Sequence, residues 1–527
     1  MKASDRSMTR LIVMIVGLAL GVRLAMVGLS PLPLNDGRLF FSFIADLVAG
    51  GLRLPTYSSY NAASIPLAYP PLGFYLIATL NLLLRIPVLQ LLRILPVLLS
   101  VASIPAFFLF AAELLRSRNQ AALATLVFAL LPRTSDWLIM GGGITRSLGL
   151  LFALLLMRQA FLLFDRRQTS AIPLAILFGT LLVCSHPEAA THTALTATLL
   201  YAWRDRSRIG LRYAAVVAGG IIAASAPWWV VIVTRHGLVP FSAAAAAARE
   251  DSYNVLAGLL ILFRLDFTDE PVLRIFAALG LLGMLIKVSR REYFLGTWFL
   301  LLHTVEPRGG TLFMMIPLAL GAGFCLETFM LPPLRHTRRS PEATTGRSGA
   351  SDSAHSNEML PAKGARLVLA LLALYGCVSS YAVGLRIQRE FTLTWRELQA
   401  FEWVREHTSH GSRFALVTGA LPLRDASSEW FPALTNRRSL ATVFGMEWVR
   451  GVDFADQTER YRSLQACARE DATCLEAWAR EQAQVFDYVY VRGGEAAESM
   501  ALRESLARSP EYALVYAHEG IAIFKRE

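Results

Sequence analysis

Repeated apolar runs of membrane-spanning length constrain this chain more than any other feature of its sequence. The first run extends from Leu11 to Leu29, close to the ~20 apolar residues that cross a bilayer as one helix. Further runs follow as far as Leu385, and 54% of the 527 residues are hydrophobic while 17% are charged. A soluble protein of this length does not carry so many spanning runs. We therefore predict a polytopic α-helical membrane protein, with the first run retained as a helix rather than cleaved.

The basic residues predict the topology, because they crowd the cytoplasmic ends of membrane helices. Lys2, Arg6 and Arg10 precede the first run and place the N-terminus in the cytoplasm. If the short run Leu72 to Leu84 enters only the outer leaflet, Arg93 to Leu115 becomes the second span and five later basic clusters all become cytoplasmic. These clusters are Arg116 with Arg118, Arg166-Arg167, Arg204 to Arg212, Lys287 to Arg291, and Arg335 to Arg366.

This topology predicts about eleven transmembrane helices and a C-terminal α/β domain outside the cytoplasm. The spans after the second are Ala121–Leu131, Leu148–Phe164, Ile172–Ser185, Ala190–Trp203, Tyr213–Val233, Val272–Ile286, Tyr293–His303, Leu312–Phe329 and Leu367–Leu385. The predicted division is a transmembrane domain (1–336) with an external first loop (30–92), a disordered cytoplasmic linker (337–366), a last helix (367–387) and an extracytoplasmic domain (388–527). The protein is then a multi-pass protein of the inner or plasma membrane. The net charge of +11 reflects this topology and indicates no nucleic acid.

The last region has the composition of a soluble domain. The pattern predicts a helix over Leu398–His407, buried strands at Phe414–Thr418 and Tyr488–Val491, and a closing strand pair at Tyr512–Tyr516 and Ile521–Phe524. Cys467 and Cys474 lie seven positions apart in this region. Outside the cytoplasm they are expected to form a disulfide, although two free thiols in a helical hairpin fit the sequence equally well.

The predicted topology gathers a set of polar residues on the outer face. Its members are Asp36, Arg133, Asp136, Gly141 to Gly143, Arg146, His186, Glu188, His192, Trp228-Trp229, His303, Glu306, Arg308 and Gly309-Gly310. Ionisable groups at membrane depth are costly and usually face a bundle interior or a wet cavity. Arg146 and Arg308 lie on the side that the positive-inside bias disfavours, which predicts a specific anionic partner for them.

Several short motifs place the chain beside a known family. They are Asp36 in the first loop, the amphipathic surface helix Leu39 to Ala49, the re-entry Tyr69-Pro70-Pro71, the helix opening Leu95-Pro96 and the basic turn Leu115 to Arg118. With these motifs and its external C-terminal domain, the chain resembles GT-C superfamily membrane glycosyltransferases of the protein O-mannosyltransferase and aminoarabinose transferase group. The resemblance covers Met1 to about Phe329. It implies inverting transfer of a hexosyl or pentosyl group from a polyprenyl-phosphate donor to a lipid, glycan or protein acceptor.

The resemblance also suggests roles for individual residues. Asp36 is the expected base, because a carboxylate is ionised at neutral pH and can take the proton of an acceptor hydroxyl. Asp136 is the expected second catalytic acid, with Glu188 as its substitute. Arg308, and after it Arg146, is expected to bind the departing phosphate. Tyr69, His186 and Glu306 complete the predicted substrate-binding set, and the glycine runs would bring backbone N–H groups to the phosphate.

Simpler interpretations exist for most of these residues. Asp36 can cap the surface helix, and Asp136 can be merely solvated. Arg308 can pair with Glu306 or contact lipid headgroups. His186, Glu188 and His192 are metal-binding residue types, but two histidines and one glutamate make a weak signal. The sequence therefore commits to no cofactor and leaves a divalent metal open.

Larger features leave alternatives open as well. Trp228-Trp229 fits an interfacial aromatic belt better than a substrate platform. The clusters Ser428 to Pro432 and Gly445 to Trp448 either cover the pocket, bind the acceptor or belong to the domain core. A transporter or lipid flippase would show internal repeats and charged or broken helices at mid-membrane, and the sequence shows no repeat. A non-catalytic scaffold with an exported binding domain is the third hypothesis.

Overall fold

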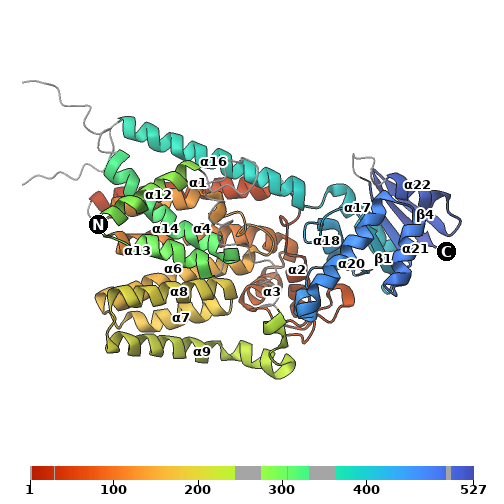
Figure 1. Ribbon diagram of the computed structural model, residues 1–527, viewed down its shortest axis with the longest axis horizontal. Coiled ribbons are helices and arrows are strands. Elements are labelled where there is room, and N and C mark those ends of the chain that lie inside the picture. The colour runs from red at the N-terminus through yellow and green to blue at the C-terminus, as the bar shows by residue number, and fades with distance from the viewer. Residues whose placement is uncertain (1–2, 29, 244–273, 306, 331–362, 494–499) are drawn as a thin grey trace, which may run out of the picture.

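The computed structural model describes residues 3–28, 30–243, 274–305, 307–330, 363–493 and 500–527. These residues form a bundle of long helices and a smaller region built on a β-sheet, which lie end to end (Figure 1). The bundle contains α1 (Ala3–Gly28), α4 (Val88–Leu115), α5 (Arg118–Leu130), α6 (Gly143–Arg166), α7 (Ala171–Val183), α8 (Pro187–Arg204), α9 (Arg208–His236), α12 (Arg274–Ser289), α13 (Phe294–Val305), α14 (Pro307–Cys325), followed by a π-helical turn (Leu326–Met330), and α16 (Lys363–Phe391).

Six of the described helices are long and apolar enough to cross a membrane: α1, α4, α6, α9, α14 with its π-helical turn, and α16. Three shorter ones, α3 (Leu72–Leu84), α7 and α13, are also apolar. The protein is therefore a helical membrane protein with six to nine apolar helices in its described part. Each of the eleven predicted spans overlaps one of the bundle helices, while eleven crossings remain a prediction.

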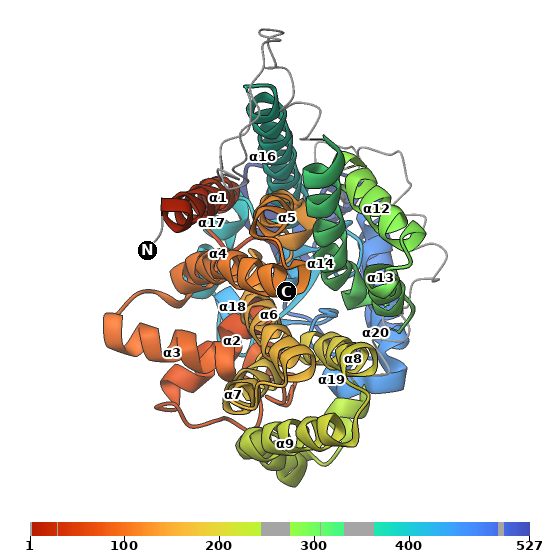
Figure 2. The ribbon, with the colours of Figure 1, turned by 90° about the vertical axis from the view of Figure 1, so that its left-hand side faces the viewer.

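The first loop contains two helices that lie apart from this parallel arrangement. Figure 2, which looks along the bundle, shows α3 from the side while α4 and α6 are seen more nearly along their axes. Helix α2 (Arg38–Ala49) buries Phe43 and Leu47 in a common core with Phe74 of α3. At its far end α3 exposes Leu83 and Leu84. A helix of 13 residues in this orientation fits the predicted entry into one leaflet only.

Ion pairs collect the basic residues at one end of the bundle. Asp165 pairs with Arg116 and Arg204, and Glu113 pairs with Arg158 and Arg166. Three of the five basic clusters that fixed the predicted topology thus send a residue to the same end. The ends of the helices that carry the candidate site residues lie opposite.

The C-terminal region contains a five-stranded mixed sheet in the order β2-β1-β3-β5-β4. Its strands are β1 (Arg413–Val417), β2 (Arg438–Ser439), β3 (Tyr488–Arg492), β4 (Tyr512–His518) and β5 (Ile521–Arg526). Strand β1 is parallel to β2 and β3, whereas β5 is antiparallel to both β3 and β4. The four predicted strands are confirmed, and the short edge strand β2 was not predicted.

Helices α17 (Trp395–His407), α18 (Ala426–Thr435), α19 (Glu447–Arg450), α20 (Phe454–Ala466), α21 (Ala472–Glu481) and α22 (Met500–Arg508) complete this region. Helix α17 confirms the predicted helix and begins with a capping box between Thr394 and Glu397. Cys467 and Cys474 form a disulfide between the end of α20 and α21, which resolves the alternative that the sequence left open. The predicted linker lies outside the described residues, apart from its last residues at the start of α16. Residues 244–273 lie outside them as well.

Candidate functional site

The first loop lies against the glycine run that precedes α6. The Gly141 N–H donates to the Leu34 carbonyl oxygen at 3.0 Å. A Cβ atom on Gly141 would lie 2.0 Å from the Asp36 carbonyl oxygen, and one on Gly37 would lie 2.8 Å from the Gly141 Cα. Gly37 also has a left-handed backbone (φ 117°), which favours glycine. The two loops can approach this closely only because both positions lack a side chain.

This approach fixes the Asp36 carboxylate, which is 7% exposed. The Gly142 N–H donates to Asp36 Oδ1 at 2.6 Å, and Arg146 Nη1 donates to Oδ2 at 2.8 Å. We call Asp36, Gly142 and Arg146 the Asp36 cluster. Helix α2 has Gly37 at its N-cap position and no capping side chain, so the alternative that Asp36 caps this helix is wrong. The Gly142 N–H and the Arg146 guanidinium each bind one of the two carboxylate oxygens, so together they fix its orientation.

Gly141→Ala is expected to lower the free energy of unfolding by ~1–3 kcal/mol, the usual cost of forcing extra volume into a packed site. The new methyl group would collide with the Asp36 backbone. Thermal unfolding of the purified protein measures the effect. Gly219→Ala is the control, because its Cβ atom would meet nothing within 4 Å. Equal melting temperatures for both variants would contradict this packing.

A second acid and a second arginine lie next to the Asp36 cluster. The guanidinium groups of Arg146 and Arg133 lie 5.0 and 5.9 Å from the centre of the Trp137 ring. Arg133 pairs with Asp136 at 3.6 Å, and its Nε donates to Thr311 Oγ1 at 3.1 Å. Asp136 Oδ1 accepts from the Trp137 N–H. Asp136 is buried, so the alternative that it is merely solvated is wrong.

Thr311 belongs to α14 and brings the first turn of this helix to the site. Arg308 lies in that turn, but its side chain is outside the described residues, as is the whole of Glu306. Their predicted roles are therefore untested. Gly309-Gly310 lie within α14 and not in the predicted turn, because the helix already begins at Pro307.

Tyr69, the first residue of the re-entry segment, lies beside the Asp36 cluster. Its hydroxyl lies 3.5 Å from Thr145 Oγ1, and its ring contacts those of Phe40, His186 and Trp448. Burial raises the pKa of Tyr69 to about 12; Glu188 and Asp36 add to the shift, whereas Thr145 and Arg146 oppose it. The phenol is therefore neutral at physiological pH and can donate a hydrogen bond to a ligand.

The two predicted histidines have structural contacts in this arrangement. His186 is the N-cap residue of α8, and its Nδ1 accepts from the Ala189 N–H at 3.3 Å. His192 is fully buried and its ring stacks on Phe313. Among the described residues no group of three or more His, Cys, Asp or Glu side chains could hold a metal ion.

The C-terminal region closes over the first loop through a buried ion pair. Arg38 at the start of α2 pairs with Glu429 of α18, and both side chains are almost fully buried. Arg38 also lies 4.5 Å from the centre of the Phe444 ring. Burial lowers the pKa of Arg38, and the neighbouring Tyr60 and Asp36 oppose this shift. The cluster Ser428 to Pro432 thus covers the first loop.

Sequence reasoning missed the role of this pair. One signal was present, since an arginine in the first turn of a helix opposes the helix dipole and calls for a specific partner. Two further bonds join the same regions: the Tyr60 hydroxyl donates to the Glu429 carbonyl oxygen at 2.6 Å, and Trp430 Nε1 donates to the Asn35 carbonyl oxygen at 3.3 Å. The residue before Asp36 is therefore bonded directly to the C-terminal region.

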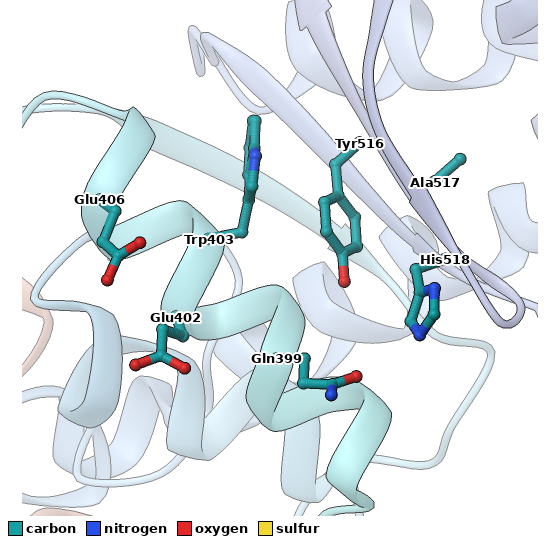
Figure 3. A pocket seen from close by; sticks show the side chains of 7 residues that line it. All are labelled: Gln399, Glu402, Trp403, Glu406, Tyr516, Ala517 and His518. Atoms are coloured by element: carbon teal, nitrogen blue, oxygen red, sulfur yellow. The ribbon is translucent and has the colours of Figure 1, made fainter.

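A wider hollow of about 470 Å³ lies on the C-terminal region alone. Figure 3 shows the rings of Trp403 from α17 and Tyr516 from β4 beside one another in it, with His518 next to Tyr516. Glu402 and Glu406 line the same hollow, which makes it unfavourable for a phosphate. No predicted site residue lines it, so we place the candidate site at the Asp36 cluster.

Comparisons with known proteins agree with a membrane protein of this architecture. Residues 68–337 match the family described as "6-pyruvoyl-tetrahydropterin synthase related domain; membrane protein". The chain belongs to this family. The matched part begins just before Tyr69 and includes Gly142 and Arg146, whereas Asp36 and the β-sheet region lie outside it. A search of curated proteins found no significant match.

Solved structures of two proteins, ArnT and AftD, share the fold at low sequence identity. ArnT from Cupriavidus metallidurans in the apo state is 13% identical with a TM-score of 0.56, over 98% of both chains. A second ArnT structure, bound to undecaprenyl phosphate, matches 97% of both chains with a TM-score of 0.55 and 13% identity. The arabinofuranosyltransferase AftD from Mycobacteria is 17% identical with a TM-score of 0.55, and this chain spans 40% of its length. The chain therefore has an ArnT-like fold.

Proposed function

We propose that this protein is an inverting GT-C-type glycosyltransferase that moves a hexosyl or pentosyl group from a polyprenyl-phosphate donor to an acceptor hydroxyl. The observation that carries the proposal is the Asp36 carboxylate, held by Gly142 and Arg146 where the bundle meets the C-terminal region. The fold similarity to ArnT, which has been solved with undecaprenyl phosphate, supports this class of donor.

The reaction needs a base, a leaving group that accepts the bonding electron pair, and a group that binds the resulting anion. Asp36 takes the proton of the acceptor hydroxyl as its oxygen forms a bond to the anomeric carbon. The bond from that carbon to the phosphate oxygen breaks, and its electron pair leaves with the lipid phosphate. Arg146 contacts Asp36 with one Nη atom, so its remaining N–H groups can bind this phosphate. The same guanidinium therefore orients the base and stabilises the leaving group.

The neighbouring residues have supporting roles in this proposal. Arg133 lies beside Arg146 on the Trp137 ring and adds positive charge, while Asp136 balances it. Tyr69 donates a hydrogen bond to the sugar or phosphate. Glu188 and His186 line the edge of the site next to Tyr69. Arg308 is proposed to reach the phosphate from the first turn of α14.

We further propose the predicted topology, with a cytoplasmic N-terminus and the Asp36 cluster on the outer face. The division into residues 1–336, 337–366, 367–387 and 388–527 is part of this proposal. The disulfide between Cys467 and Cys474 supports it, because structural disulfides persist in oxidising compartments. The acceptor therefore meets the site outside the cytoplasm.

The test is transfer of a labelled sugar by the purified full-length protein from a panel of polyprenyl-phosphate hexoses and pentoses. Arg146→Gln is expected to raise KM for the donor at least about tenfold, because it removes a charge-assisted bond to the phosphate. Arg146→Lys should recover part of this loss. Arg158→Gln, on the same helix but paired with Glu113 at the opposite end, is the control.

Transfer that is unaffected in Arg146→Gln would contradict the assignment of the phosphate site. Absence of transfer with every donor of the panel, together with transport of one of these lipids into the opposite leaflet of a vesicle, would instead favour the flippase hypothesis.

A further inference from the structure

A second pocket, of about 190 Å³, lies where the first loop meets the C-terminal region. Three arginines line it, and each comes from a different element: Arg438 from β2, Arg450 from α19 and Arg460 from α20. Asn61 closes it from the first loop. We call this the arginine pocket. Of the residues that line it, none is Asp or Glu.

Within the part of the chain that the structure describes, no salt bridge neutralises these three arginines. Over the described ranges, neither Arg438 nor Arg450 has a carboxylate within salt-bridge distance. Arg460 is held in place, since its Nε donates to Gln482 Oε1 at 2.9 Å. Burial lowers the pKa of Arg460, and the like charge of Arg450 lowers it further, while Asp456 opposes both. Like charges that converge in this way favour a bound anion.

The rest of the pocket is held by specific hydrogen bonds. Asn61 has a left-handed backbone (φ 54°), and its side chain both donates to the Ser439 carbonyl oxygen at 2.9 Å and accepts from the Ser439 N–H at 2.7 Å. Gln457 donates to the Thr442 carbonyl oxygen. These bonds fix the wall next to Arg438 before any ligand arrives, which lowers the entropic cost of binding.

One short segment connects the arginine pocket with the Asp36 cluster. Phe444 lies against Arg38 and Trp448 lies against Tyr69, while Met446 between them lines the arginine pocket. Residues 444–448 thus contact the first loop through Phe444 and Trp448 and line the arginine pocket through Met446. No helix of the bundle lines the pocket, so an anion carried by a sugar fits it better than a lipid headgroup.

We propose that the arginine pocket binds a phosphate or carboxylate group carried by a sugar, and that this group belongs to the acceptor. Arg450 and Arg460 bind the anion, and Arg438 closes the outer side. The role as an acceptor site rests on the proposed transferase activity, whereas the binding itself does not. Binding is therefore measured without any donor, so that the two proposals can fail separately.

The experiment uses the full-length protein in neutral detergent and isothermal titration with glucose 6-phosphate, glucuronate and glucose. At least one of the two anionic sugars is expected to bind, and glucose is not. The double variant Arg450→Gln/Arg460→Gln should weaken binding roughly tenfold or more, since each lost charged hydrogen bond lowers affinity by about that factor. The double lysine variant, which keeps both charges, should retain most of it.

Arg462→Gln is the matched control, because Arg462 lies on α20 beside Arg460 but is exposed and pairs with Glu459. It should bind like the unaltered protein. Failure of both anionic sugars to bind would overturn the proposal, as would equal losses in Arg462→Gln and the double glutamine variant. Nanodiscs with and without phosphatidylglycerol test the other source of phosphate. Binding that needs this lipid, is lost in the double variant and is not competed by either sugar would also overturn it.

Discussion

Asp36→Asn is expected to lower the turnover of sugar transfer by about 10²–10⁴-fold, the range typical of a lost general base. The asparagine oxygen can still accept from the Gly142 N–H, so the loop should keep its position and the protein its melting temperature. Arg146 loses its anionic partner and becomes more available to a phosphate. Donor binding should therefore stay equal or become tighter while turnover falls, which initial rates and a donor titration separate.

The control for this variant is Asp46→Asn. Asp46 lies in α2, the helix that follows Asp36, and its carboxylate accepts from Ser58 and Ser59 within the first loop. Its replacement makes the same chemical change in the same segment, and it should leave turnover within about threefold, as for a residue outside the reacting groups. Unchanged turnover in Asp36→Asn would remove Asp36 from the mechanism. Equal losses in both variants would point to a general disturbance of the first loop.

Glu429→Ala is expected to destabilise the contact between the two regions by ~3–5 kcal/mol, because it leaves Arg38 as a buried charge without its partner. Arg38→Met should have a similar effect, because it leaves Glu429 as a buried charge without its partner. The double variant Arg38→Met/Glu429→Met should regain most of the lost stability, since replacing a whole buried pair by apolar residues is often neutral. Melting curves and limited proteolysis between the bundle and the C-terminal region measure these differences.

This double-variant cycle distinguishes a buried pair from two independent residues. If the effects of the two single variants simply add in the double variant, the side chains do not interact. Arg405→Met is a suitable control, because Arg405 is exposed and pairs with Glu402 on the surface of α17, where an ion pair contributes ~0–1 kcal/mol.

The fold could be predicted where it depends on local sequence pattern. The apolar runs predicted the membrane class and positions that overlap all eleven described bundle helices. Buried runs ended by glycine and the turn at His518 to Gly520 predicted four of the five described strands. The number of membrane crossings could not be predicted from the sequence. The helices α5, α7 and α13 are shorter than a bilayer is thick, so only their packing decides how they lie. The edge strand β2 consists of two residues, too few for any periodic signal.

The candidate site was predictable only in part, because its contacts join distant segments. Charge patterning placed Asp36 and Arg146 on one face, but it could not pair them across 110 positions or reveal that Gly142 supplies the second contact of the carboxylate. The alternative that Asp36 caps α2 failed for a similar reason: the left-handed Gly37 turns the chain so that the carboxylate points to α6 instead. Arg38 and Glu429 lie still further apart, and only the folded chain shows that they are partners.

The contacts above the first loop also determine when the site can form during synthesis. Trp430 follows its partner Asn35 by 395 positions, and Glu429 follows its partner Tyr60 by 369 positions. At ~5–20 residues per second, the ribosome needs on the order of 20–80 s to cover that distance. Throughout this interval the first loop lacks its contacts with Glu429 and Trp430. The proposed site is thus completed last, and a chain truncated before Glu429 is expected to lack the proposed activity.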